Sequence, residues 1–175
     1  TITMPLEGTS SSLNLQPRID IKSIPASATV VNDVTNASTG QTWMDRNLGA
    51  RRVSTASDDG LSYGNMYQWG RGSDGHEIIV RDGDNSSTDG VGLNGTTSTL
   101  ASSPNPGHND FIRTPSSPRD WLNPKDDNLW QGTAGVNNPC PSGYRLPTAA
   151  EWTTEEADFA TDNPAGAIGS PLKLS

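Results

Sequence analysis

The sequence predicts an α+β domain made of short strands, long loops and one or two helices. Hydrophobic residues make up 31% of the chain and the mean hydropathy is -0.62, with 18 Gly and 13 Pro. This composition is typical of loop-rich domains and differs from that of helical bundles, in which Ala, Leu, Glu and Lys dominate. Five Trp, three Tyr and two Phe provide aromatic anchors that disordered chains lack. A length of 175 residues is enough for one domain with a core and short for two.

The first part of the chain, residues 1–27, is rich in Ser, Thr and Pro. We expect a linker or an extended segment leading into the domain, with one edge strand where Ile19 and Ile21 alternate with polar residues. Residues 28–175 are then predicted to form the ligand-binding domain. Its last residues, 170–175, carry no helix stop and resemble the start of a strand, so we expect the domain to be cut short there.

Three strands are predicted in the first half of the domain. Residues 28–34 are rich in β-branched side chains, and residues 36–40 supply turn chemistry before a second strand at 41–48. Together they predict a hairpin. Residues 77–81 are a further short strand candidate.

Two helical segments are predicted. Tyr63 and Tyr67 lie four residues apart, which allows one or two helical turns before Gly70.

The clearer helix starts at Thr148, which can form a capping box with Glu151. Trp152 and Phe159 lie seven residues apart and are expected to share its buried face. The helix is predicted to end at Asn163-Pro164.

The net charge of -8, from 20 acidic and 12 basic residues, disfavours nucleic acid as a partner because the surface would repel phosphates. Hard cations are favoured instead, and calcium is the natural choice outside a cell. No apolar run is long enough to span a bilayer, which argues against direct membrane insertion. The single cysteine, Cys140, cannot form a disulfide within the chain.

Calcium ligands are expected in residues 82–128, a long polar stretch that needs an ion or a ligand to order it. Residues 81–90 alternate oxygen-bearing side chains on a glycine-containing loop, as a calcium ion of high coordination number requires, although the pattern is not an EF-hand. The alternative is that these residues are solvated turn residues. The candidate ligands are Asp82, Asp84, Asp89, Asp110, Asp120, Asp126, Asp127 and Asn128.

The aromatic residues have two interpretations. Trp43 and Trp152 are expected in the core, because so few other large apolar residues exist. Tyr67, Trp69 and Trp130 fit the core and a ligand platform equally well.

Catalysis is not expected. His76 and His108 are the only histidines, and the chain has no HExxH, GxSxG or P-loop pattern. The sequence therefore predicts a binding protein rather than an enzyme.

Four motifs carry a family resemblance. They are GQTWMDRNLGA at 40–50, YGNMYQWGRGSDGH at 63–76, DNLWQG at 127–132 and NNPCPSGYRLPTAAEW at 137–152. They resemble the signatures of the Fibrobacter succinogenes major paralogous domain family over roughly residues 40–175. That family continues through further strands that often include a second cysteine, so the resemblance leaves open whether Cys140 is free or pairs with a segment absent here.

A second resemblance concerns the fold. Residues 145–152, RLPTAAEW, are similar to a segment of the formylglycine-generating enzyme family. This implies a variant of the C-type-lectin-like fold, with short twisted antiparallel strands, one or two helices and long calcium-ordered loops. The activity of that enzyme needs paired cysteines that this chain lacks, so the resemblance implies the fold and not the catalysis.

The resemblance also implies a function. A similar domain is the peptide-binding module of giant calcium-dependent repeats-in-toxin adhesins on bacterial cell surfaces. It implies an extracellular, monomeric module of a larger chain that uses Ca²⁺ to capture a peptide or protein C-terminus on another cell, for adhesion and biofilm formation. A calcium-dependent glycan-binding module is the main alternative; a hydrolase and a structural spacer are the others.

The candidate ligand-binding residues combine aromatic, amide and charged side chains. Arg71 and Arg113 enter because an acidic protein that binds a carboxylate needs a cation to offset repulsion. The full set is Tyr67, Gln68, Trp69, Arg71, Asp74, Arg113 and Trp130.

Overall fold

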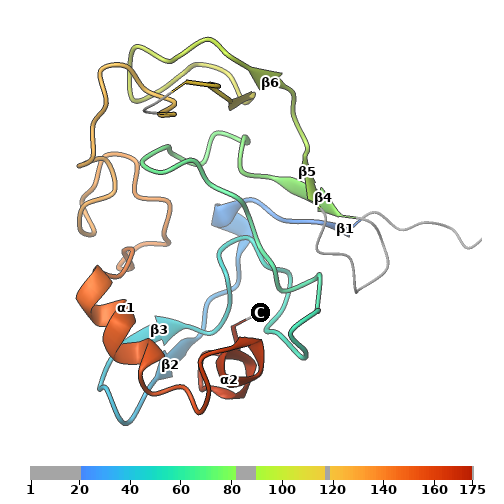
Figure 1. The fold of residues 1–175 in the computed structure, drawn as a ribbon, viewed down its shortest axis with the longest axis vertical. Helices are drawn as coiled ribbons and strands as arrows, with labels where there is room; N and C mark the ends of the chain where they lie inside the picture. Colours follow the sequence, from blue (N-terminus) through green and yellow to red (C-terminus); the bar gives the residue numbers. More distant parts are fainter. Residues whose placement is uncertain (1–20, 82–89, 117–118, 175) are drawn as a thin grey trace, which may run out of the picture.

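The computed structural model describes residues 21–81, 90–116 and 119–174. Over these residues the chain forms a small mixed domain with short strands of two or three residues and two α-helices, in agreement with the predicted α+β class. The helices and one hairpin lie at one end of the long axis, and β6 lies at the other (Figure 1). No helix in the described ranges is long and apolar enough to cross a bilayer.

A three-stranded antiparallel sheet joins the start of the described chain to its middle. It contains β1 (Ile21–Lys22), β4 (Ile79–Arg81) and β5 (Gly90–Gly92), in the order β1-β4-β5. The strand predicted at 77–81 is thus confirmed with a later start. Ser23 is buried and bonded to Ile79 in both directions, so the domain includes residues from Ile21 rather than from residue 28. Ile19 lies outside the described residues.

The predicted hairpin is present but short. Strand β2 (Asp33–Thr35) pairs with β3 (Thr42–Met44), and Val34 lies opposite Trp43. Where the predicted strand at 28–34 was expected to begin, the chain instead forms a 3-10 turn, η1 (Ala26–Ala28). The Asn36 side chain accepts from the Ser38 amide, so the turn closes through its own local hydrogen bonds.

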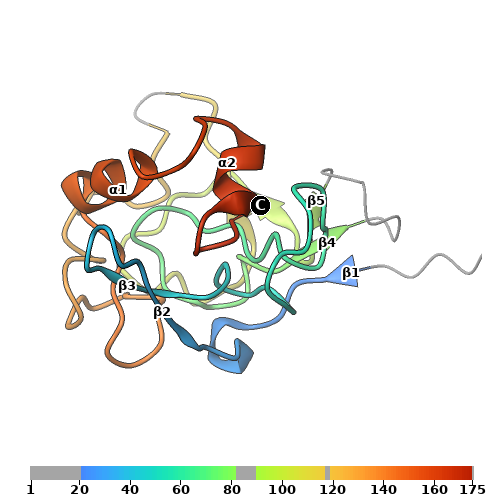
Figure 2. The ribbon, with the colours of Figure 1, turned by 90° about the horizontal axis from the view of Figure 1, so that it is seen from below.

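The helix α1 (Ala149–Glu156) starts with the predicted capping box. Its buried face differs from the prediction, because Glu155 is fully buried whereas Trp152 is 36% exposed. The expected core position of Trp152 is therefore wrong. Figure 2 shows α1 beside the hairpin, and Glu155 accepts hydrogen bonds from three hairpin side chains. These donors are Asn36, Thr39 and Trp43.

Asn163-Pro164 begins a helix rather than ending one. The helix α1 has already ended at Glu156, before Phe159. Asn163 caps a second helix, α2 (Pro164–Gly169), by accepting from the Gly166 amide, and Pro164 stands in its first turn. Proline is favoured at that position because its missing N–H has no partner there in any helix.

No helix forms between Tyr63 and Tyr67, contrary to the prediction. The backbone amides of Asn65 and Met66 donate to the carbonyls of Leu48 and Glu77 instead of to their own segment. A helix would have required those donors for bonds within the segment. Pairing with distant segments therefore overrides the four-residue spacing.

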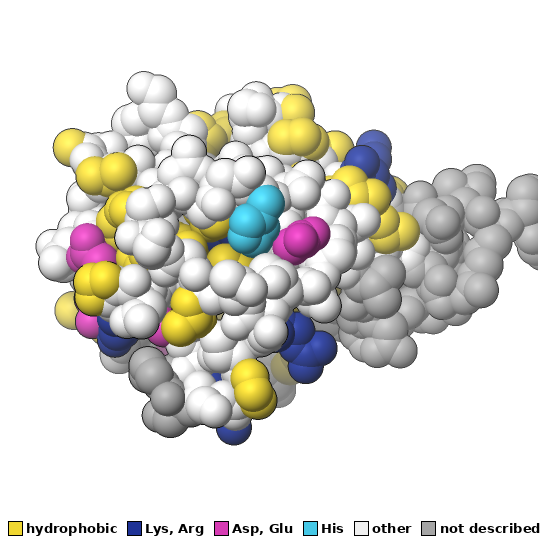
Figure 3. Space-filling model, turned by 90° about the horizontal axis from the view of Figure 1, so that it is seen from above, with side chains coloured by type: hydrophobic (Ala, Val, Ile, Leu, Met, Phe, Trp, Pro, Cys, Tyr) yellow, Lys and Arg dark blue, Asp and Glu magenta, His cyan; other side chains and the backbone are white. Residues whose placement is uncertain are grey.

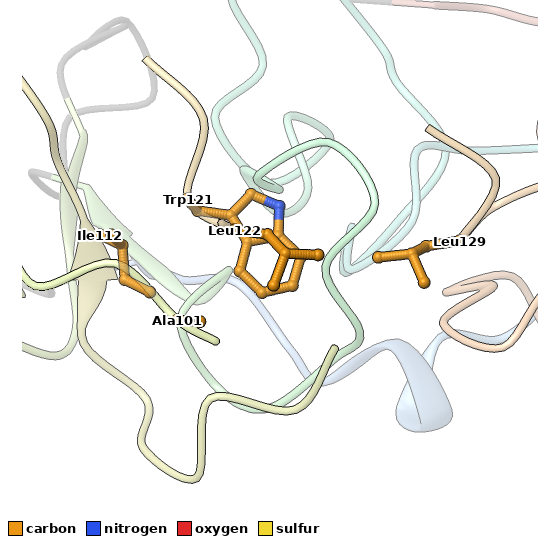
Figure 4. Packing of buried hydrophobic residues seen from close by; sticks show 5 residues of the cluster. All are labelled: Ala101, Ile112, Trp121, Leu122 and Leu129. Atoms are coloured by element: carbon orange, nitrogen blue, oxygen red, sulfur yellow. The ribbon is translucent and has the colours of Figure 1, made fainter. Parts of the chain in front are cut away.

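The stretch 82–128, predicted to be irregular, contains four of the five residues of a buried apolar cluster. Within it, β6 (Thr96–Thr97) and β7 (Phe111–Ile112) form a parallel pair, so the strands are not all antiparallel as expected. Trp121 and Leu122 lie between Ile112 and Ala101 on one side and Leu129 on the other (Figure 4). The described part of residues 82–128 therefore packs around buried side chains, four from the stretch itself and that of Leu129.

Candidate functional site

A buried arginine organises the centre of the molecule. Arg71 is 0% exposed, and its guanidinium donates to Gln68 Oε1 and Asp74 Oδ2 at 2.8 and 2.7 Å. It also donates to the carbonyls of His108 and Asp110 at 2.8 and 2.9 Å, which fixes a loop distant in sequence. Arg71 was predicted to face a ligand, but the structure turns it inward as a support.

The position of Arg71 depends on the turn before it. Gly70 has a φ of 82°, a left-handed conformation that glycine adopts without steric cost. The turn separates Trp69, which is 62% exposed, from the fully buried Arg71. Trp69 and Arg71 were both predicted to bind the ligand. The side chain of Trp69 instead points to solvent, and that of Arg71 points to the interior.

A hydrogen-bonded chain supports Arg71 from behind. The backbone amide of Gln68 donates to His76 Nε2 at 3.1 Å. Nε2 is therefore an acceptor, so the ring proton is on Nδ1, which donates to Asp74 Oδ1 at 2.7 Å. Burial acts to raise the pKa of Asp74, but the hydrogen bonds from His76 and Arg71 outweigh it and hold that pKa below its usual value. Asp74 is therefore a charged partner within the fold, although it was predicted to contact a ligand.

The side chain of Gln68 joins this network to strand β7. Its Nε2 donates to the Ile112 carbonyl at 2.8 Å, and its Oε1 accepts from the Ile112 amide at 2.9 Å. The side-chain amide of Gln68 thus makes the two hydrogen bonds to Ile112 that a neighbouring strand would make. These two hydrogen bonds fix the position of the Gln68 side chain, which also lines a cavity.

The cavity has a volume of about 610 Å³ and opens beside β7. Its charged lining residues are Arg113, Arg119 and Asp120. Both arginines are exposed, and neither guanidinium has an ion-pair or hydrogen-bond partner among the described residues. Asp120 Oδ1 accepts from the Leu122 amide. We call this the arginine cavity; it is lined by Gln68, Trp69, Phe111, Ile112, Arg113, Thr114, Pro115, Arg119, Asp120 and Trp121.

Three aromatic rings stand next to the arginine cavity. The ring centroids of Trp69 and Trp130 are 5.0 Å apart, and those of Tyr67 and Trp130 are 6.0 Å apart at 79°. Trp130 is buried and its Nε1 donates to the Arg71 carbonyl. Of the three residues that fitted core and ligand platform equally, Trp130 is core, Tyr67 is intermediate and Trp69 is exposed.

The predicted calcium ligands do not meet at one point among the described residues. Asp126 Oδ1 accepts from the backbone and side-chain nitrogens of Asn128, and Asp127 pairs with Lys125 at 2.8 Å. The Asp110 carbonyl is bound by Arg71. These contacts match the alternative interpretation, that of turn residues. Asp82, Asp84 and Asp89 lie outside the described residues.

A different group gathers possible metal ligands. Across the described ranges, the ligand atoms of Asp74, His76 and Glu77 lie within 4.8 Å of one another. Several of their acceptor atoms are already engaged, since His76 Nε2 accepts from the Gln68 backbone amide, Asp74 Oδ2 from Arg71 and Glu77 Oε2 from the Gly75 amide. Calcium takes six to eight oxygen ligands and avoids nitrogen. The donor set of the described residues therefore does not fit calcium, and this group is part of the Arg71 support.

Sequence reasoning placed Gln68, Trp69 and Arg113 in the binding site, and all three line the arginine cavity. It missed Arg119 and gave Trp121 no place in the site. One signal was available: Arg113 and Arg119 lie six residues apart in the sequence of an acidic chain, with two prolines between them.

Comparisons with known proteins add no relative. No family model matches this chain, and neither the curated proteins nor the solved structures contain a match.

Proposed function

We propose that this chain is a ligand-binding module of a bacterial surface adhesin, and that it captures the C-terminal carboxylate of a peptide or protein in the arginine cavity. The observation that carries the proposal is the pair Arg113 and Arg119, whose guanidiniums are exposed and unpaired among the described residues. Trp69 stands beside them, 62% exposed.

The chemistry of the cavity suits a carboxylate. A guanidinium presents parallel N–H donors that match both oxygens of a carboxylate, and such charge-assisted bonds are about twice as strong as neutral ones. Two guanidiniums against the single carboxylate of Asp120 leave the cavity net positive. The exposed Trp69 ring can cover the residues that precede the terminal carboxylate.

The charge of the whole chain makes the cavity selective. At a net charge of -8 the surface repels anions in general, so an anionic group is favoured only where positive charge is concentrated. Figure 3 views the end that carries β6 and shows its charged side chains set apart among uncharged side chains and backbone. A terminal carboxylate would therefore find few competing positions there.

The proposal also includes the family of the chain, its fold, its location on a cell surface and its dependence on calcium. The four sequence motifs support membership of the Fibrobacter succinogenes major paralogous domain family, and RLPTAAEW supports a C-type-lectin-like arrangement on a cell surface. Calcium dependence is proposed from the sequence alone, on the acidic residues at positions 82–89, which lie outside the described residues. We assign no contact between the peptide carboxylate and a calcium ion, because the possible metal ligands among the described residues do not fit calcium.

The test is titration calorimetry of the purified chain with one short peptide, bearing either a free or an amidated C-terminus. We expect the free form to bind at least tenfold more tightly, because charged hydrogen bonds contribute about 1.5–3 kcal/mol each. Arg113→Gln and Arg119→Gln should each remove most of this difference. Lys22→Gln removes the same charge from an exposed site on β1, outside the cavity lining, and should leave the difference unchanged. Equal affinities for both peptide forms would contradict the proposal.

The second candidate function is glycan binding, favoured by one observation. An indole exposed to 62%, as in Trp69, offers a flat face on which a sugar ring can stack. A glycan array run beside the peptide titration separates the two functions. Binding to neutral glycans that Trp69→Ala abolishes and Arg113→Gln leaves intact would favour the glycan module.

A further inference from the structure

His76 connects the interior of the domain to the wall of the arginine cavity. Its neutral ring accepts the Gln68 backbone amide at Nε2, and the Gln68 side chain makes two hydrogen bonds to Ile112 in β7. We propose that His76 is a pH-sensitive switch: when its ring takes up a second proton, Gln68 separates from β7 and the arginine cavity loses affinity for a carboxylate. The part that concerns the ligand rests on the proposed function.

The second proton can enter the ring at only one atom. Nδ1 already carries a proton and donates it to Asp74 Oδ1 at 2.7 Å, so the second proton goes to Nε2. Nε2 faces the Gln68 backbone N–H at 3.1 Å. A protonated Nε2 would place two donors against each other, and the hydrogen bond would be lost. The arrangement seen in the structure therefore requires the neutral ring of His76.

The ring of His76 has little freedom to move away from Gln68. His76 is 1% exposed, and its ring centroid lies 5.9 Å from that of Tyr67 and 6.0 Å from that of Phe111. Protein interiors are close-packed, so moving a buried ring sacrifices its contacts. Gln68 is half-buried and is followed by the exposed Trp69, so the backbone of Gln68 is the part that moves.

The charged groups around the ring act in opposite directions. Asp74 and Glu77 lie 2.7 and 3.4 Å from Nδ1, and their negative charges favour a second proton. Arg71 bonds to the other oxygen of Asp74, and its positive charge opposes that proton. Phe111 of β7 is uncharged, and Tyr67 stays neutral because burial raises its pKa. The two carboxylates thus favour protonation, whereas the amide at Nε2 makes it incompatible with the present contacts.

A movement of Gln68 reaches the cavity through Ile112. The Gln68 side chain donates to the Ile112 carbonyl at 2.8 Å and accepts from the Ile112 amide at 2.9 Å. Its Oε1 also accepts from Arg71 Nη1 at 2.8 Å. Arg113 follows Ile112 in the chain and supplies one of the two guanidiniums of the cavity. A displaced Gln68 therefore leaves β7 without this anchor and changes the position of the Arg113 guanidinium.

The sign of this coupling gives the pH window. The contacts need the neutral ring, so affinity is full at about pH 7.5 and falls as the pH is lowered through the range in which histidine titrates. The other charges of the binding step stay constant, because a terminal carboxyl titrates near about pH 3.5 and arginine above about pH 12. Asp74 stays ionised, since the hydrogen bonds from His76 and Arg71 hold its pKa below the usual value. The chain has two histidines, His76 and His108.

The first experiment needs no ligand. NMR spectra of the nitrogen-labelled chain are recorded between about pH 7.5 and about pH 5. We expect the Ile112 amide signal to shift over the same pH range in which the His76 ring nitrogens take up the proton. The indole signal of Trp121, whose N–H donates to the Trp69 carbonyl at 2.7 Å in the cavity wall, should shift with it. A ring that stays neutral, or that is protonated without a shift of the Ile112 amide, overturns the switch.

The second experiment repeats the calorimetry with free and amidated peptides at about pH 7.5 and about pH 5.5. We expect the dissociation constant of the free-carboxylate peptide to rise about tenfold at the lower pH. His76→Gln retains a neutral acceptor and should flatten this pH dependence. His108→Asn removes the exposed histidine, keeps a side-chain acceptor for the Asp110 amide and should leave the pH dependence unchanged. If His76→Gln does not fold, the NMR titration of the native chain decides.

The outcomes separate the switch from the proposed function. Equal affinities for free and amidated peptides at about pH 7.5 overturn carboxylate capture, and the NMR titration still decides the switch. A carboxylate preference that is the same at both pH values overturns the switch and leaves carboxylate capture standing. A pH dependence that His108→Asn abolishes and His76→Gln retains overturns the assignment to His76.

Discussion

At the scale of single residues, two arginines of the same chain have opposite roles. Arg71 is buried and each of its contacts lies within the protein, whereas Arg113 is exposed and unpaired among the described residues. Burial decides the difference, because a buried guanidinium must find its partners inside the fold. The sequence around each arginine carries little information about which role it has.

Replacing each arginine by methionine tests this contrast. Arg71→Met should lower the free energy of unfolding by about 3–5 kcal/mol, because it breaks a buried charged network. Arg113→Met should change it by less than about 0.5 kcal/mol, as surface substitutions usually do. Urea unfolding followed by tryptophan fluorescence measures both values. Similar values for the two variants would mean that Arg71 does not have this supporting role.

Cys140 is a second residue whose surroundings define its chemistry. It is a free, half-buried cysteine that lines a second cavity together with Tyr67 and Trp130, and burial raises the pKa of its thiol to about 11. A thiol with that pKa is protonated at neutral pH and a poor nucleophile. In the described structure Cys140 therefore acts as a small apolar side chain of the cavity wall.

At the scale of elements, one carboxylate joins helix α1 to the hairpin β2–β3. Glu155 Oε1 accepts from Asn36 Nδ2 at 2.7 Å, and Oε2 accepts from Thr39 Oγ1 and Trp43 Nε1 at 2.9 and 3.0 Å. All three partners are donors. The contact thus needs a group that can only accept, which an ionised carboxylate is.

Two adjacent glutamates provide a matched test of this contact. Glu155→Gln turns an NH₂ group toward one or more donors and should lower the free energy of unfolding by about 1–3 kcal/mol, the cost of leaving a buried polar group unpaired. Glu156→Gln makes the same change at the neighbouring exposed position and should have almost no effect. Urea midpoints compare the two, and equal midpoints would show that Glu155 does not stabilise the contact between helix and hairpin.

At the scale of the whole molecule, an acidic chain combines a net positive cavity with an uncharged aromatic one. Several side chains bond to the backbone of segments that are distant in the sequence. Gln68 and Arg71 connect the segment 68–76 to the loop 108–112 in this way. The cavity walls are therefore only as stable as these long-range bonds.

Calcium dependence belongs to this scale, because an ion held by acidic residues of the segment 82–89 would stabilise the whole folded state. We expect the melting temperature to rise by about 5–10 °C at a calcium concentration near 100 times the dissociation constant, from about 2.7 kcal/mol of linkage. Differential scanning fluorimetry with calcium, magnesium or a chelator measures the effect. An unchanged melting temperature in the presence of the chelator would exclude a stabilising calcium site.

The sequence by itself determined the features that depend on neighbours a few residues apart. These are the mixed α+β class, the hairpin turn near Asn36 and the capping box of Thr148 and Glu151. Each of these depends on composition or on local hydrogen bonds, which a linear pattern displays directly.

Only the tertiary structure decided where strands end, which arginine is buried and which residues form the cavities. Gln68 meets Ile112 across 44 residues, and Asn36 meets Glu155 across 119. No local pattern encodes such pairs, because each depends on two distant segments reaching the same place. The same competition for backbone donors removed the helix expected at Tyr63 and Tyr67.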